Sequence, residues 1–354
     1  MILSSKLQNL TITSNLFTLT RHYYASEVLM SYHTKSIHYR NIKKFNRIIS
    51  IFLFGIIIGW WSHSQSEEKF QPNNDPRKNN FIFIGGHESS GTGLMRILLD
   101  VHPLIRCGPE PIITTSLLQL KRMYERNPKQ LYAAGIYPNV YNRAIAAYFS
   151  EIIINMGQSA KYLCHKQPFT FYYLNYLNEI FINAKFIHMV RDGRAVIASS
   201  IKRAVNPTYV SDKPYLAFEY WEVITKKMLE DCIQIGPSRC LTIRYEDLIL
   251  NTLEETKKVF RFLNLPWDPI ILKHETVIHK ISSLSPYEAS SKQVINKINR
   301  NSLLSWSYNQ SILPRQLIEK VHLQSKLLHR LGYSQLGFPP NYSLLKPFEQ
   351  NVLK

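Results

Sequence analysis

The sequence predicts an α/β protein whose core is a P-loop-like parallel sheet flanked by helices. Short apolar runs at residues 81–86 (FIFIGG), 185–190 (KFIHMV) and 240–243 (CLTI) have the length of buried strands. Apolar residues recur at helical spacing after the first two runs and at 113–126, 144–156, 216–236 and 253–263. Strands that alternate with helices are typical of a parallel sheet covered on both faces. We therefore expect one domain over residues 81–354.

Composition limits the possible partners. The chain has 354 residues, 45% of them apolar, and a net charge of +18. Residues 1–47 hold seven Lys or Arg residues and one acidic residue, which leaves a net charge of +12 for the remainder. The basic residues are dispersed and form no single stripe, so we expect no nucleic-acid partner. The excess suits an anionic cofactor and acidic substrates.

A neutral stretch near the N-terminus predicts a membrane anchor. Residues 48–61 (IISIFLFGIIIGWW) are apolar, and the neutral stretch extends to residue 66 behind Lys43, Lys44 and Arg47. Nineteen residues approach the minimum for a span, and the preceding positive charge favours a type II orientation. A buried core helix and a cleaved signal peptide are the alternatives. We expect a cytoplasmic tail at 1–47, an anchor at 48–66, a stem at 67–80 and a lumenal domain at 81–354.

All four cysteines follow this anchor and would face an oxidising lumen. Their spacing shows no metal-type pairing. Cys232 and Cys240 could close a local loop, which would leave Cys107 to pair with Cys164; four buried free thiols are the alternative. Two triplets that begin at Asn309 and Asn341 match the glycosylation sequon.

The first candidate site is the loop at residues 86–93 (GHESSGTG), between the first strand and the next helix. Backbone N–H groups in such a loop, together with the helix N-terminus, can bind a phosphate. A Walker loop would carry Lys at position 92 and Ser or Thr at 93; Thr92 and Gly93 stand there instead, which disfavours a nucleoside triphosphatase. An ordinary tight turn is the alternative.

The second candidate site begins at Arg191, at the end of the second predicted strand, with Ser199 and Arg203 on the following helix. Ligands of open parallel sheets bind beyond the carboxyl ends of the strands. An Arg and a hydroxyl there suit a second phosphate, and hence a nucleotide with phosphates at both ends. A surface pair between Arg191 and Asp192 is the alternative.

The segments GTGLMR (91–96), IRCG (105–108), YLC (162–164), MVRDGRA (189–195), LPW (265–267) and QVI (293–295) occur in the same order in the tyrosylprotein sulfotransferases, which this sequence resembles over residues 81–342. The resemblance implies a sulfotransferase fold. It also implies transfer of a sulfuryl group from 3′-phosphoadenosine 5′-phosphosulfate (PAPS) to peptidyl tyrosine in acidic segments of secretory and membrane proteins. A homodimer in the Golgi membrane would carry out this reaction.

The resemblance also assigns residues. It places Glu110 as the catalytic base, Lys166 as the cation that stabilises the transition state and Ser290 as an assisting hydroxyl. It places disulfides at Cys107–Cys164 and Cys232–Cys240. The implied cofactor contacts are Ser89, Ser90, Gly91, Thr92, Gly93, Arg191, Ser199, Arg203, Tyr245, Ser290, Ser291, Gln293, Val294, Ile295, Asn299 and Ser305.

The implied mechanism needs no metal, and the sequence shows no metal-ligand cluster. A phenol, with a pKa of about 10, is a poor nucleophile at lumenal pH, so a carboxylate must accept its proton. Charge that develops on the leaving oxygen needs a cation, here Lys166. As alternatives, Glu110 would be only a loop carboxylate and Lys166 only a surface cation.

The sequence departs from the family at several basic positions. Ser89 and Gly93 stand where the family loop has Arg and Thr, and Ser305 replaces a cofactor-binding Lys. Gln167 replaces an Asp, and Ile112 and Ser116 occupy the substrate-facing arginine positions. Three hypotheses follow: a divergent active enzyme, a weakened or inactive relative that binds peptide or nucleotide or regulates a paralogue, and a transferase for another acceptor such as a glycan. The first is favoured because Glu110, Lys166, Arg191 and Ser199 are all retained.

Overall fold

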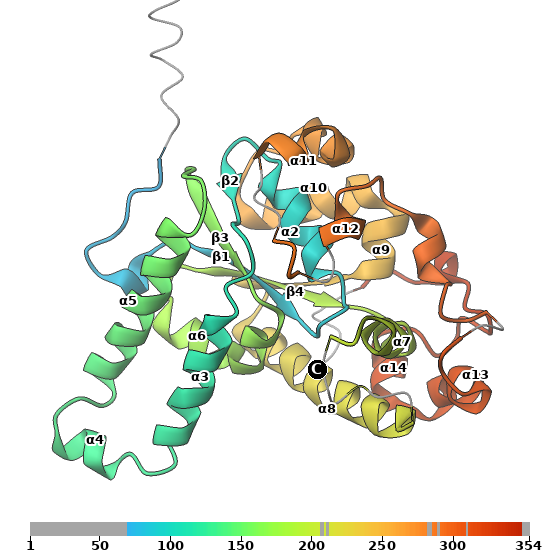
Figure 1. Ribbon diagram of the computed structural model, residues 1–354, viewed down its shortest axis with the longest axis horizontal. Helices are drawn as coiled ribbons and strands as arrows, with labels where there is room; N and C mark the ends of the chain where they lie inside the picture. Colours follow the sequence, from blue (N-terminus) through green and yellow to red (C-terminus); the bar gives the residue numbers. More distant parts are fainter. Residues whose placement is uncertain are drawn as a thin grey trace, which may run out of the picture. The chain divides into compact units, whose positions relative to one another are not determined.

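The chain folds around one parallel sheet (Figure 1). The computed structural model describes residues 69–205, 209, 212–281, 285–288, 291–308 and 311–348. The strands lie in the order β2-β3-β1-β4-β5, and all neighbours are parallel. Their bounds are β1 (Ile82–Gly86), β2 (Ile105–Arg106), β3 (Tyr162–Lys166), β4 (Lys185–Val190) and β5 (Cys240–Arg244). The predicted parallel α/β fold is confirmed.

Helices connect these strands. The α-helices are α2 (Thr92–Asp100), α3 (Ile113–Tyr124), α4 (Lys129–Ala133), α5 (Asn139–Asn155), α6 (Leu174–Ile180), α7 (Gly193–Arg203), α8 (Pro214–Ile235), α9 (Tyr245–Leu250), α10 (Thr252–Leu263), α11 (His274–Ile281), α12 (Ser291–Val294), α13 (Arg315–Gln324) and α14 (Lys326–Arg330). The 3₁₀ helices are η1 (Pro76–Lys78), η2 (Pro168–Tyr173), η3 (Pro269–Lys273), η4 (Arg300–Leu303) and η5 (Tyr342–Leu344). The longest, α8, begins at Pro214 and ends before Gly236, whose φ of 89° suits glycine.

Both faces of the sheet are buried. Ile82 and Ile84 of β1 belong to a core cluster that α2 also joins, whereas Phe81 and Phe83 point to the opposite side and belong to a second cluster with residues of α3, α5 and α6. This alternation follows from the two-residue period of a strand, and apolar residues at successive positions are typical of a sheet covered on both sides. In Figure 1, α2 lies on one side of the sheet and α6 on the other, whereas α8 contributes residues to both clusters.

The sequence did not predict β2 and β3. Strand β3 has the sequence YLCHK, in which His165 and Lys166 interrupt the apolar run. His165 is nevertheless buried, and its Nε2 lies 3.0 Å from the Thr114 hydroxyl on α3. Strand β2 has only two residues. A polar side chain that finds a partner in the core thus conceals a strand from a search for apolar runs.

The structure describes the N-terminal region only from residue 69 onward. The predicted tail and anchor, residues 1–66, lie outside the described residues, and no described helix combines the length and hydrophobicity that a bilayer crossing requires. Within the predicted stem, residues 69–80 pack on the domain. Phe70 stacks on Phe81, and the buried Asn79 amide donates to Ser150 Oγ at 3.1 Å.

A buried polar network ties the ends of β4 and β5 to the C-terminal segment. Asp192 accepts three hydrogen bonds from Arg194 and one from the Tyr342 hydroxyl at 3.0 Å. Its own amide donates to Glu246, which also accepts from Tyr333. The side chains of Asp192 and Arg194 are both fully buried, so the charge of each one compensates the charge of the other.

We therefore expect Asp192→Ala to lower the free energy of unfolding by about 3–5 kcal/mol, because Arg194 would remain buried without its counter-charge. Urea denaturation measures this value. In the exposed pair between Glu254 and Lys257, Glu254→Ala should cost less than about 1 kcal/mol. Equal effects of the two variants would contradict the account.

Candidate active site

The carboxyl ends of the strands converge on a cavity of about 540 Å³. The loop after β1, Lys166 at the end of β3, Arg191 after β4 and Tyr245 after β5 all line it, as parallel strands require. The predicted site residues that line the cavity are Ser89, Gly91, Thr92, Gly93, Glu110, Ile112, Lys166, Arg191, Ser199, Arg203, Tyr245, Gln293, Val294 and Asn299.

The loop between β1 and α2 has the conformation of an anion cradle. Ser89 has φ of 66° and Gly91 of 100°, and α2 begins at Thr92 without a side-chain cap. A Cβ on Gly91 would lie 2.4 Å from Cδ2 of Tyr245, so only glycine allows this close approach. Ser90 is buried, and its hydroxyl has no partner among the described residues. Free first-turn amides and an unsatisfied buried hydroxyl fit a bound phosphate group.

His87 stabilises the start of this loop through hydrogen bonds at both of its ring nitrogens. Its Nδ1 lies 2.9 Å from the Glu88 carbonyl oxygen, which can only accept, so Nδ1 carries the proton and Nε2 accepts from the Tyr209 hydroxyl. Burial lowers the pKa of His87 to about 4, which agrees with a neutral ring. We assign His87 a structural role.

Arg191 lies at the opposite side of the cradle, packed on Tyr245. Its guanidinium carbon is 4.4 Å from the centre of the Tyr245 ring, and its two terminal nitrogens donate to the carbonyls of Ser89 and Ser302 at 3.2 Å. Its Nε is buried without a partner among the described residues. The Tyr245 hydroxyl lies 3.2 Å from Ser302 Oγ. Arg191 is thus oriented and retains a donor for an anion.

Arg203 lies beside the position where the loop lacks the family's Arg. Its Nη2 donates to Ser89 Oγ at 2.5 Å, and Ser89 Oγ is also 2.8 Å from Ser200 Oγ. Burial and the nearby Arg191 lower the pKa of Arg203. Two neighbouring cations at one end of a cavity favour a strongly negative ligand. Arg203 of α7 thus brings a guanidinium beside Ser89.

Glu110 and Lys166 form the polar centre at the other side of the cavity. Lys166 Nζ donates to Glu110 Oε2 at 2.7 Å and to Glu288 Oε2 at 3.0 Å. Lys166 is 2% exposed, whereas the Glu110 side chain is 20% exposed and open to a substrate. The interpretation of Lys166 as a surface cation is wrong, since the side chain is buried between two carboxylates.

Five of the predicted site residues that the structure describes do not line the cavity. Ser116 is exposed on α3, one turn beyond Ile112, and Ser305 is exposed and donates to the Ser302 carbonyl at 3.3 Å. Ser291 donates to the Ser285 carbonyl at 2.7 Å, and Ile295 packs against the core. Ser90 lies buried within the loop. Ser290 lies outside the described residues, as does the sequon residue Asn309.

The sequence did not predict several of the residues that line the cavity. Glu288 contacts Lys166, and Ser302 contacts both Arg191 and Tyr245. Phe169, Tyr287 and Lys297 also line the cavity. A signal was available for Phe169, which lies three residues after Lys166 in the segment YLCHKQPF. Glu288 and Ser302 belong to an irregular segment without periodicity, and no pattern marks them.

The two predicted disulfides are confirmed, Cys107–Cys164 and Cys232–Cys240. The first joins the segment that leads to Glu110 with strand β3, two residues before Lys166. It therefore restrains the base and the cation relative to each other. The second closes the local connection between α8 and β5.

Comparison with known proteins identifies relatives. Residues 81–269 match the sulfotransferase family. The protein-tyrosine sulfotransferase A of Caenorhabditis elegans is 37% identical over 77% of this chain and 72% of its own length, and the protein-tyrosine sulfotransferase 1 of Danio rerio is 38% identical over 75% and 76%. Among solved structures, a sulfotransferase domain from the curacin biosynthetic pathway aligns with a TM-score of 0.43 at 18% identity, over 66% of this chain and 93% of that domain.

Proposed function

Since this chain belongs to the protein-tyrosine sulfotransferase family, we propose that it transfers the sulfuryl group of PAPS to tyrosine residues of secretory and membrane proteins. One observation carries the proposal. A partly exposed carboxylate, Glu110, lies 2.7 Å from a buried lysine in the same cavity as a phosphate cradle. A base, a cation and an anion site are the groups that this transfer needs.

Each residue of the proposed catalytic set has its own role in the transfer. Glu110 accepts the phenolic proton as the phenol oxygen bonds to sulfur, while the bond from sulfur to the bridging oxygen breaks and its electron pair stays on that oxygen. Lys166 stabilises the charge that develops there. Ser290 is proposed as a second donor. When bound, PAPS supplies the activated sulfuryl group.

The binding of the nucleotide is proposed for two groups of residues. The loop at 89–93 would hold the 5′-phosphosulfate through backbone amides and the Ser90 hydroxyl, which has no other partner among the described residues. Arg191, Ser199 and Arg203 would hold the 3′-phosphate, supported by the unpartnered Nε of Arg191. Tyr245 packs against both Gly91 and Arg191 and so links the two sites.

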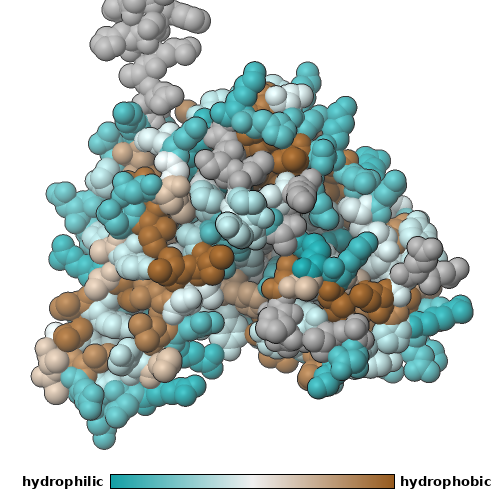
Figure 2. Space-filling view, viewed as in Figure 1, coloured by the Kyte–Doolittle hydropathy of each residue, from teal (hydrophilic) through white to brown (hydrophobic). Residues whose placement is uncertain are grey.

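The cellular setting is proposed from the resemblance. We propose a type II anchor in the Golgi membrane, glycosylation at Asn309 and Asn341, and a homodimer. Asn341 is exposed at the start of η5. Apolar side chains gather on the surface over α3, α4 and α5 (Figure 2), among them Met123, Tyr132 and Val140. This surface supports association with a second copy.

A transfer assay tests the proposal. The full-length protein in detergent is incubated with radiolabelled PAPS and a peptide that carries one tyrosine among acidic residues, and the same peptide with phenylalanine serves as the control. We expect label only on the tyrosine peptide. An acidic preference follows from the net charge of +12 outside residues 1–47. Tight binding of 3′,5′-adenosine bisphosphate without any transfer would favour the inactive relative, and loss of both would exclude the proposed reaction.

A further inference from the structure

Glu288 contacts both residues of the proposed catalytic pair. It is 9% exposed and lies just before α12, in the segment that covers the cavity. Its Oε1 accepts a hydrogen bond from the backbone amide of Glu110 at 2.8 Å. Its Oε2 accepts one from Lys166 Nζ at 3.0 Å. One carboxylate thus holds the backbone of the base and the side chain of the cation.

The contact with the Glu110 amide has particular weight because of the local sequence. Glu110 stands between Pro109 and Pro111, and neither proline has a backbone N–H. The Glu110 amide is therefore the one backbone donor of this three-residue segment. Glu288 accepts that hydrogen bond, so the position of the Glu110 main chain depends on a residue 178 positions away.

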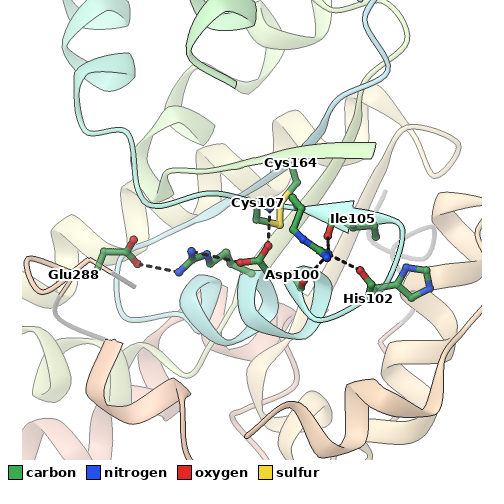
Figure 3. The surroundings of a disulfide bond; sticks show 8 residues. Asp100, His102, Ile105, Cys107, Cys164 and Glu288 are labelled. Atoms are coloured by element: carbon green, nitrogen blue, oxygen red, sulfur yellow. Dashed lines mark hydrogen bonds and ion pairs between the residues drawn. A yellow bond between two sulfur atoms is a disulfide. The ribbon is translucent and has the colours of Figure 1, made fainter. Parts of the chain in front are cut away.

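A row of alternating charges keeps Glu288 ionised. Burial alone would raise the pKa of its carboxyl, but Lys166 and Arg96 outweigh burial and hold the pKa below its usual range. Arg96 Nη1 lies 3.9 Å from Glu288 Oε2, and Arg96 Nη2 lies 3.5 Å from Asp100 Oδ2. Arg96 therefore bridges Asp100 and Glu288, the two carboxylates labelled in Figure 3.

The row ends at the disulfide. Asp100 Oδ1 accepts from the backbone amide of Cys107 at 2.9 Å, beside the Cys107–Cys164 bond (Figure 3). From Asp100 through Arg96, Glu288 and Lys166 to Glu110, the signs alternate. The chain of contacts therefore fixes the segment 107–110 at both of its ends.

We propose that Glu288 is a positioning residue that aligns Glu110 with Lys166 and makes this alignment depend on the seating of the covering segment. The inference rests on the proposed function, because Glu110 and Lys166 are its base and cation. Residues 293, 294 and 299, a few positions further on, line the same cavity. A ligand that contacts these residues would therefore also act on the position of the carboxylate that holds the base.

The consequence for the reaction concerns Lys166. In the free protein its ammonium is shared between two carboxylates. When Glu110 takes up the phenolic proton, its attraction for Lys166 falls, and Glu288 remains as the carboxylate that holds the ammonium in place beside the leaving oxygen. Loss of Glu288 should thus lower kcat more than it raises the KM for either substrate.

Three variants separate the two contacts. Glu288→Gln keeps an acceptor for the Glu110 amide and removes the charge; Glu288→Ala removes both; Glu275→Gln on α11, whose ion-pair partner is His274, is the control. For Glu288→Gln we expect kcat to fall about 10- to 100-fold, the loss of a charge-assisted hydrogen bond, with KM for PAPS within about threefold of wild type. Glu288→Ala should lower kcat further, and Glu275→Gln should match wild type.

Hydrogen–deuterium exchange gives a readout that needs no activity. In a proteolytic peptide that spans residues 107–113, we expect the Glu110 amide to exchange at least about tenfold faster in Glu288→Ala, because a lost hydrogen bond costs protection. In Glu288→Gln, the exchange rate of the Glu110 amide should stay near that of wild type. Exchange unchanged in Glu288→Ala would overturn the proposal, as would wild-type kcat in Glu288→Gln. If wild type itself shows no transfer while Glu288→Ala alters exchange as expected, the proposed function fails and the positioning contact stands.

Discussion

Glu110→Gln should lower kcat for sulfuryl transfer by about 10²–10⁴-fold, the usual contribution of a general base. The amide of Gln is nearly isosteric with the carboxylate and can still contact Lys166, but it cannot accept the phenolic proton. The Glu110 side chain is the more exposed member of its pair with Lys166, so an acceptor can reach it. Initial rates with saturating PAPS and a tyrosine peptide measure the effect.

Nucleotide binding separates this loss from a loss of folding. The Glu110 side chain pairs with Lys166, and 3′,5′-adenosine bisphosphate lacks the sulfuryl group on which the proposed base acts. The Kd of this nucleotide should therefore stay within about threefold of wild type. Calorimetry on both proteins provides the comparison. A Glu110→Gln variant with wild-type kcat would assign the base to another residue.

The sequence was sufficient for the parts of the fold that local physics determines. β1 is apolar apart from its glycines, whereas β4 and β5 each have one polar residue in an otherwise apolar interior, His188 and Thr242. β3 was missed because its apolar run is only three residues long before His165 and Lys166, although Thr114 satisfies His165 and two carboxylates satisfy Lys166. Tertiary partners that compensate a buried polar group leave no trace in local periodicity.

The same limit applies to the site. Residues placed at the carboxyl ends of predicted strands, such as Arg191, could be identified from their position alone. Glu288 could not, because it is 178 residues from Glu110 and 122 from Lys166 and belongs to no regular element. The substitution at Ser89 also needed the structure, since only the contact with Arg203 Nη2 shows that a guanidinium lies at this position.

Gly91→Ala should raise the Kd of 3′,5′-adenosine bisphosphate by about 10- to 100-fold, since strain of about 1–3 kcal/mol at a functional position is released by distortion of the loop. Gly91 has φ of 100°, and the new Cβ would stand 2.4 Å from Cδ2 of Tyr245. Because Arg191 packs on the same Tyr245 ring, displacement of that ring would disturb both proposed phosphate sites at once.

A second glycine allows the clash to be separated from backbone strain. Gly135 also has positive φ, 70°, but a Cβ there would meet no atom within 4 Å. Gly135→Ala thus carries a comparable backbone cost without a steric conflict, and it lies in the turn between α4 and α5, away from the cavity lining. We expect its nucleotide affinity to match wild type, while thermal unfolding should show a loss of stability in both variants that is larger in Gly91→Ala, because only there the backbone cost is joined by a clash. If Gly91→Ala binds the nucleotide as tightly as Gly135→Ala does, the close approach of Tyr245 to the loop is not what shapes the anion site, and the loop's role in binding PAPS would have to be abandoned.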